Sequence, residues 1–424
     1  MQEDFLHYLW KFKKYAFAKA ATTAHLPITF IQVGQHNLLS GPDFFNAKLI
    51  IGDQTWAGNV EIHIKSSDWY AHHHEVDTAY DNVILHVVWE HDVEIYRKDN
   101  TAIPTLVLKD LVSKEALVSY EKLFNNQSQQ WINCENSIRE IPEMIQSNWL
   151  ERLYFERLTR KTEDITPMLK KVNGNWEAAL LVLLMRSFGT KVNANAFQSI
   201  AEKLDFTTVR KCAQEPFRLE ALLLGIGGLL PDNTTDSYAM QLQGEYEFVS
   251  HKFQIASDGI LPVQFYKLRP DNFPTIRLSQ VSQLYHKHHN LFQQLMTVSD
   301  IQALYNIFEI YASAYWDTHF SFGKEQKKRR KKLTTSFIDI IIINAVIPLR
   351  FFYNQYLGRD ESEVLLSMMH AIKPESNSVI KKYGTLRARA QNAQETQALL
   401  ELKAHYCDLN KCLSCAFGNY LIKH

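Results

Sequence analysis

The pattern of apolar and polar residues changes twice along the chain. Residues 3–17 place apolar side chains three or four positions apart, which predicts an amphipathic helix. From about residue 28, short runs rich in β-branched and aromatic residues follow one another, separated by turn sequences such as GDQT and KDNT. The runs ITFIQV, FNAKLII, WAGNVEIHIK, NVILHVVWE and VEIYRK predict a sheet of about five strands.

After about residue 113 the strand signals stop and helical spacing dominates, as in ALVSYEKLF and WEAALLVLLMRSFG. The polar segment 125–142, which ends at a proline, is a predicted linker. We therefore expect an α+β protein in three parts. These are an α/β sheet domain over residues 1–124, the linker, and a large all-helical domain over residues 143–424.

The most apolar run is FIDIIIINAVIPLRFF, residues 337–352. Polar residues and Pro348 interrupt it, so it falls short of a membrane span and predicts a buried core helix ending near the proline. The N-terminus opens with two acids and lacks the features of a secretory signal. The odd number of cysteines, five, is typical of a reducing compartment. We expect a cytoplasmic protein without a membrane partner.

The chain carries no net charge, since 46 Lys and Arg residues balance 46 Asp and Glu residues. A nucleic-acid partner must therefore be met by a local basic patch. Six consecutive cations are candidates for this patch, although a solvated loop between helices is the alternative. They are Lys327, Lys328, Arg329, Arg330, Lys331 and Lys332.

The stretch GPDFFNAKLIIGDQTWAGNVEIHIK, residues 41–65, carries the candidate catalytic residues. Side chains alternate along a strand, so Glu61, His63 and Lys65 share one face. Asp43 directly follows a proline and would approach that face if the two strands are neighbours. Two carboxylates with a base or a cation form a minimal site for Mg²⁺ or Mn²⁺. The alternative is a hairpin whose polar residues simply face solvent.

This arrangement resembles the PD-(D/E)XK nuclease superfamily, which has a restriction-endonuclease-like fold. The resemblance implies that Asp43 and Glu61 ligate the divalent ion, and Glu3 is available as the further acid on the first helix. His63 stands where the superfamily has lysine, so His63 or Lys65 would position the attacking water. The implied activity is that of a metal-dependent nuclease or phosphodiesterase. A non-catalytic nucleic-acid-binding or scaffold protein with a degenerate nuclease core is the alternative.

A group of histidines follows in the loop SSDWYAHHHEVDTAYD and on the next strand. His72, His74 and Asp77 lie in the loop, and His86 lies in NVILHVVWE. Together with His63 they form a set that suits Zn, Mn or Fe better than Mg. A transition-metal enzyme is therefore a further hypothesis. The alternative is an exposed histidine tract beside a core histidine.

The C-terminal cysteines Cys407, Cys412 and Cys415 have the spacing C-x4-C-x2-C. A C-x2-C turn places two thiolates on one edge of a tetrahedron, and a third can complete most of a ligand shell. Zn²⁺ or an iron–sulfur cluster needs a fourth ligand, for which Cys134 and His405 are the candidates. Such a site would stabilise the protein by tying the linker to the C-terminus. Buried packing cysteines are the alternative.

The complete pattern of motifs also resembles a family. It comprises GPDF, GNVEIH, SDW followed by H-x-H and Asp, VILHVV, the sequence RPDNFPTIR and the terminal cysteines. The pattern is similar over nearly the whole chain to an uncharacterised bacterial family known as a domain of unknown function. This resemblance implies no activity.

Overall fold

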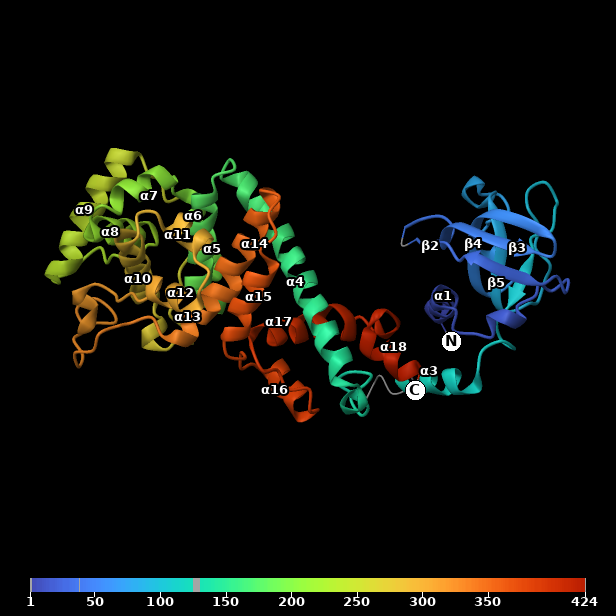
Figure 1. Cartoon of the computed structure of the whole chain (residues 1–424). Helices are drawn as coiled ribbons and strands as arrows, with labels where there is room; N and C mark the ends of the chain where they lie inside the picture. Colours follow the sequence, from blue (N-terminus) through green and yellow to red (C-terminus); the bar gives the residue numbers. More distant parts are fainter. Residues whose placement is uncertain (1, 38, 125–129, 424) are drawn as a thin grey trace. The chain divides into compact units, whose positions relative to one another are not determined.

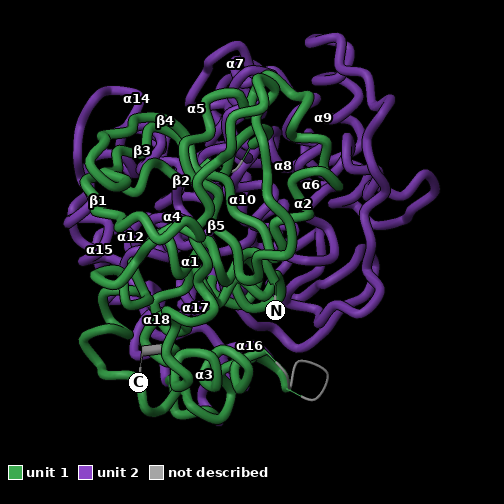
Figure 2. Tube along the Cα trace, turned by 90° about the vertical axis from the view of Figure 1, so that its right-hand side faces the viewer, with its two compact units in different colours: residues 1–149, 386–388, 402–424 green, residues 150–385, 389–401 purple. Residues whose placement is uncertain are grey.

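The computed structural model describes residues 2–37, 39–124 and 130–423 (Figure 1). The chain forms two compact units, coloured separately in Figure 2. The sheet unit comprises residues 1–149, 386–388 and 402–424, and the helical unit comprises residues 150–385 and 389–401. The predicted α+β class is confirmed, because a mixed sheet is followed by many helices. Part of the predicted linker, residues 125–129, lies outside the described residues.

The sheet unit is built on a six-stranded mixed sheet. Its main path runs β1-β3-β4-β5-β6, and the short β2 pairs with β3. Neighbouring strands are antiparallel from β1 to β4 and parallel from β4 to β6. The bounds are β1 Ile28–Gln32, β2 Gln35–His36, β3 Phe44–Ile51, β4 Gln54–Lys65, β5 Val83–Glu90 and β6 Thr105–Val107.

The predicted strand VEIYRK is wrong. It forms a loop in which the backbone of Arg97 bonds to Thr101 and that of Ile103 bonds to Ile95. The last strand of the path is instead β6, which is parallel to β5. Parallel strands need a long crossover connection, and VEIYRK follows β5 too closely to return beside it in parallel.

The core of the sheet unit lies between the sheet and the helix α1 (Glu3–Phe12). The helix α1 packs against β4, and its apolar face shares a core with Val60 and Ile62 of β4 and with residues of β5. Two further helices, α3 (Lys114–Phe124) and α18 (Ala416–Lys423), lie side by side, and Ile422 reaches this core (Figures 1 and 2). The C-terminus therefore packs with the sheet unit, although the sequence grouped it with the helical domain. The unit's short helices are η1 Phe17–Lys19, α2 Asp68–Ala71, η2 Thr78–Tyr80, η3 Ile138–Glu140, η7 Lys403–Cys407 and η8 Cys412–Ser414.

Two helices have residues in both units, α4 (Glu143–Lys171) and α17 (Ala393–Leu402). The rest of the helical unit consists of α5 Trp176–Phe188, α6 Thr190–Lys203, α7 Phe206–Cys212, α8 Pro216–Ile226, α9 Ser237–Phe253, η4 Pro270–Asn272, α10 Pro274–Lys287, α11 Leu291–Thr297, α12 Ile301–Ile307, η5 Ala314–Asp317, α13 Thr335–Ile341, η6 Ile342–Val346, α14 Ile347–Tyr356, α15 Ser362–Ala371 and α16 Ser378–Thr385.

The apolar segment of the helical unit is one continuous helical stretch, Thr335–Tyr356, whose most apolar 18-residue window has a mean hydropathy of 1.7. Its length and composition would allow it to cross a membrane, but 67% of that window is buried in the protein, as in a core helix. The predicted end near Pro348 is wrong, because the helix continues to Tyr356. The π-helix η6 ends at Val346, two residues before the proline. Its shifted hydrogen bonding accommodates a residue that lacks a backbone N–H.

Candidate metal centre

The two faces of strand β4 differ in polarity. Val60 and Ile62 face the apolar core, whereas Glu61 and His63 point to the other face. The parallel register places His86 of β5 opposite Glu61. These three ionisable side chains are only 5%, 2% and 0% exposed. Buried polar groups need partners, so the surroundings of this face decide its chemistry.

The loop after β4 is anchored over this face. Ser66 donates a hydrogen bond to the Asp92 carboxylate and accepts one from the Asp92 backbone, both at 2.9 Å. Ser67 donates to the other oxygen of Asp92 at 2.7 Å. Trp69 is buried against Tyr80 at the far end of the loop. The histidine tract between these anchors is thereby held beside β4.

The imidazole of His63 is the centre of a cluster. Its Nδ1 lies 2.8 Å from Nε2 of His86, and its Nε2 lies 3.2 Å from Nδ1 of His72. Oε1 of Glu61 lies 3.4 Å from Nε2 of both His63 and His74. One ring nitrogen from each of His63, His72 and His74 falls within 4.8 Å of the other two. Three imidazoles therefore converge on one place, and the Glu61 carboxylate lies against two of them.

Burial sets the electrostatics of the cluster. It lowers the pKa of His63 to about 3, with His74 and His72 acting in the same direction. Burial also lowers the pKa of His74 and of His86. Neutral imidazoles keep a lone pair that can bind a metal ion. Burial and then the Asp43 carboxylate raise the pKa of Glu61, so a bound cation would compensate its charge.

Asp43 lies beside Glu61 but is held by the protein. Its backbone N–H donates to Oε2 of Glu61 at 3.1 Å, and its Oδ2 accepts from the N–H of Ile62 at 2.9 Å. Nε2 of His7, on α1, lies 3.2 Å from the same Oδ2. Although burial opposes it, the Asp43 carboxylate raises the pKa of His7. Burial and then Asp43 raise the pKa of Glu3, one turn earlier on α1.

The structure therefore brings together most of the predicted site residues. They are Glu3, Asp43, Glu61, His63, His72, His74 and His86. Lys65 is exposed at the end of β4, and Asp77 instead caps η2 by accepting from the N–H of Ala79. His7 was missed, although it lies four residues after Glu3 on one helical face, a spacing that could have indicated it.

The basic segment of the helical unit is largely engaged within that unit. Arg329 forms an ion pair with Asp271, and Lys332 pairs with Glu309 at 2.6 Å. Arg330 stacks on the Tyr311 ring at 3.8 Å, and Lys331 is buried. Lys327 and Lys328 are exposed. Phosphate binding by the segment stays a prediction.

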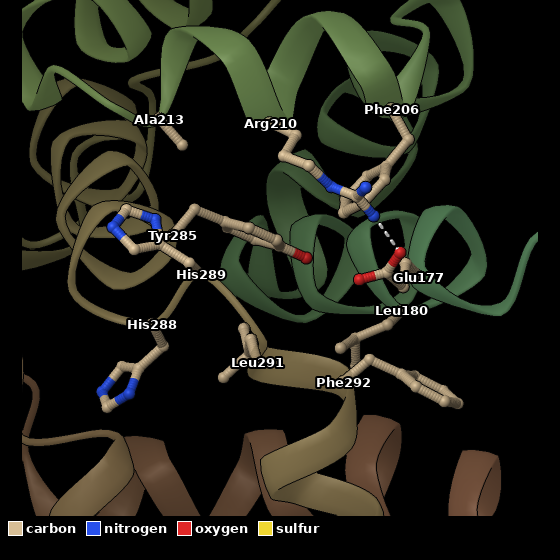
Figure 3. Close-up of a pocket in the computed structure, with 10 residues that line it drawn as sticks. All are labelled: Glu177, Leu180, Phe206, Arg210, Ala213, Tyr285, His288, His289, Leu291 and Phe292. Carbon is tan, nitrogen blue, oxygen red and sulfur yellow. Dashed lines mark hydrogen bonds and ion pairs between the residues drawn. The ribbon is translucent and has the colours of Figure 1, made fainter.

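A pocket in the helical unit is a weaker candidate (Figure 3). Phe206, Tyr285 and Phe292 line it, and Arg210 forms an ion pair with Glu177 at its side. Its volume is about 10 Å³, enough for about one water molecule. A substrate does not fit in this space, so the cluster on the sheet is the better candidate.

Fold and site define an α+β protein with a three-histidine cluster beside a glutamate on a mixed sheet, and three imidazoles are a donor set for a candidate metal site. The chain belongs to the family described as protein of unknown function (DUF2851), whose model matches residues 3–378. This confirms the predicted resemblance to a family of unknown function. Comparisons with curated proteins and with solved structures give no match. The matched residues include the whole histidine cluster and end before the C-terminal cysteines.

Proposed function

We propose that the sheet unit is a metal-dependent phosphodiesterase that acts on nucleic acid. The observation that carries this proposal is the convergence of His63, His72 and His74, with Glu61 against two of these imidazoles and beside Asp43. Three nitrogen donors and one oxygen donor suit Zn²⁺, Mn²⁺ or Fe²⁺ better than Mg²⁺. The metal therefore differs from the Mg²⁺ that a site of two carboxylates would favour.

The residues around His63 support a ligand role for its imidazole. Metal-ligating histidines commonly donate their second ring N–H to a neighbouring acceptor, which fixes the tautomer. Nδ1 of His63 can donate to Nε2 of His86 at 2.8 Å, which leaves Nε2 for the ion. His63 stands at the lysine position of the PD-(D/E)XK resemblance, but this environment favours metal binding over activation of water.

The chemistry of such a centre follows from its donors and neighbours. A bound transition-metal ion lowers the pKa of water and polarises a phosphoryl oxygen. His72 is the most exposed of the three histidines, so the side of the cluster next to it is open to solvent. Asp43 favours a cationic His7, and a cation beside the centre would stabilise negative charge on a phosphate.

The substrate class is supported by the order of elements. An acid on the first helix, Asp43 at the start of β3, and Glu61 with His63 two residues later on β4 match the order in the PD-(D/E)XK resemblance. The sheet is antiparallel up to β4, and β5 is parallel to β4 after the crossover that carries the histidine loop. Phosphodiester hydrolysis is the reaction that this resemblance implies.

The test is a cleavage assay on the full chain. Linear duplex DNA, single-stranded DNA and RNA are incubated with Mn²⁺, Zn²⁺ or Mg²⁺. We expect cleavage with a transition metal, and a loss of more than about 100-fold in Glu61→Ala and His63→Ala. His73→Asn is the matched control, because His73 belongs to the same tract but its side chain is 80% exposed. Asparagine also tolerates the positive φ of 61° at this position.

Two outcomes would contradict the proposal. One is cleavage that survives His63→Ala, because the activity would then come from elsewhere or from a contaminant. The other is metal binding without cleavage of any of the three nucleic acids, which would favour the non-catalytic alternative.

A further inference from the structure

Four of the five cysteines meet in the sheet unit, away from the histidine cluster. Cys134, Cys407, Cys412 and Cys415 line one pocket. Cys134, and not the other candidate for a fourth ligand, His405, thus lies in this pocket with the three C-terminal cysteines. The other walls of the pocket are formed mainly by Leu123, Leu402, Tyr406 and Phe417. A set of thiols that line a mostly apolar pocket can hold a soft metal centre shielded from water.

The C-terminal cysteines lie on a closely packed loop. The N–H of Lys411 donates to the carbonyl of Tyr406 at 2.9 Å, and that of Cys415 donates to Cys412 at 3.2 Å. The side chain of Asn419 donates to the Cys415 carbonyl at 3.0 Å. Gly418 packs so closely that a Cβ atom there would overlap the Cys412 carbonyl. The loop therefore presents its thiols in a set conformation.

The segment that carries Cys134 is fastened to this loop. Asn133 donates from its amide to Sγ of Cys412 at 3.4 Å and to Oδ1 of Asn410 at 3.3 Å. Burial raises the pKa of Cys134, and Cys407, Cys415 and Cys412 raise it further because they are near. Two segments distant in sequence thus place all four thiols around one pocket.

We propose that Cys134, Cys407, Cys412 and Cys415 bind an iron–sulfur cluster. A cluster is held by four cysteine thiolates, and several iron atoms separate the sulfurs of its ligands. Each thiol loses its proton on ligation, and the iron and sulfide are supplied to the apoprotein from outside the chain.

The spacing favours a cluster over a single zinc ion. A tetrahedral zinc with Zn–S bonds of ~2.3 Å would hold every sulfur pair about 3.8 Å apart. Among the described residues, the ligand atoms that gather in threes within 4.8 Å belong to histidines, and the cysteines do not form such a group.

The cluster would act as a cross-link in the sheet unit. Cys134 follows α3 in the chain, and the C-terminal cysteines directly precede α18, whose Ile422 lies in the core with α1. A cluster would therefore tie α3 and α18 together and hold the C-terminus on the sheet. This role does not depend on the histidine cluster or on the proposed phosphodiesterase activity.

The first test is the composition of the full chain purified without oxygen and then reconstituted with iron and sulfide. We expect iron and acid-labile sulfide in equal amounts, with a brown colour that bleaches on reduction. Zinc without sulfide would overturn the proposal, and so would a chain that takes up no iron. His63→Ala is expected to keep its acid-labile sulfide, which separates this site from the metal centre on the sheet.

Variants locate the cluster. Cys134→Ser and Cys412→Ser are expected to lower the iron content at least about tenfold. Cys212→Ser is the matched control, since Cys212 is the remaining cysteine and is buried on α7 in the helical unit. Iron loss in Cys212→Ser equal to that in Cys412→Ser would overturn the assignment.

Asn133→Ala tests the site without removing a ligand, in case the serine variants do not fold. We expect this variant to keep its iron. Its reduction potential should become more negative, because hydrogen bonds to the ligating sulfurs raise the potential. An unchanged potential in an iron-loaded variant would contradict the placement of the cluster at Cys412.

Discussion

His86 determines how firmly His63 is held for a metal ion. His86 is fully buried, and its Nε2 lies 2.8 Å from Nδ1 of His63. The change His86→Leu removes this acceptor and keeps an apolar side chain of moderate size in a site that packs against Trp69. His86 is not a proposed ligand, and it would act on the metal only through its contact with His63. The variant therefore isolates the orienting hydrogen bond.

The expected magnitude follows from that single hydrogen bond. Loss of an outer partner of a metal ligand typically costs 10- to 100-fold in affinity, or about 1.4–2.7 kcal/mol. Leaving a buried donor such as Nδ1–H of His63 unsatisfied costs about 1–3 kcal/mol, which agrees. The free energy of unfolding without metal should change less than the metal affinity. The variant also removes Nδ1 of His86, a buried atom that has no hydrogen-bond partner among the described residues, and losing such an atom offsets part of the cost.

The assay is a competition titration of Zn²⁺ and Mn²⁺ between a coloured chelator and the full chain. We expect a 10- to 100-fold weaker Kd in His86→Leu, a larger loss in His63→Ala and no change in His73→Asn. The reasoning is refuted if a folded His86→Leu binds metal as tightly as the parent. It is equally refuted if that variant loses as much affinity as His63→Ala.

The remaining predictions concern the metal, the buried Glu220 and two glycines. Removal of metal with a strong chelator should abolish nucleic-acid cleavage, and Mn²⁺ should restore it in the same assay; activity that persists in the chelator would refute a metal-dependent reaction. The fully buried Glu220 accepts hydrogen bonds from four side chains, so Glu220→Ala should lose about 3–5 kcal/mol of stability in urea unfolding. Burial raises the pKa of Glu220 above 4.5. The contribution of this shift to stability is therefore complete below pH 4.5, and it is lost as the pH rises through the pKa of Glu220 in the folded protein. Glu220→Gln, which cannot ionise, should flatten this part of the stability profile, and an unchanged profile would contradict the assignment. In β4, a Cβ at Gly58 would lie 2.5 Å from Ile84 and 2.6 Å from the Asn82 carbonyl, so Gly58→Ala should cost about 1–3 kcal/mol in thermal unfolding. Gly244→Ala, in helix α9 with no neighbour within 4 Å, should instead stabilise by about 0.5–1 kcal/mol.

The fold was predictable where the signal is local. Apolar alternation located β1, β3, β4 and β5, and helical spacing separated the sheet from the helices. The prediction was wrong where a distant contact decides the outcome. VEIYRK has a strand-like composition but must form the crossover to β6, and the helix expected to stop near Pro348 continues through a π-turn. Neither effect can be read from the residues of the segment alone.

The sequence by itself determined that Glu61 and His63 share one face of a strand, because alternation is a property of the extended backbone. It also determined the spacing of the C-terminal cysteines. Only the tertiary structure decided that His86 lies opposite Glu61, because that depends on the register between two parallel strands. The anchored loop decided that His74 turns towards Glu61 while His73 faces solvent. The return of residues 402–424 to the sheet unit decided that Cys134 meets the other three thiols, since packing of the C-terminal helix in the core brings these segments together.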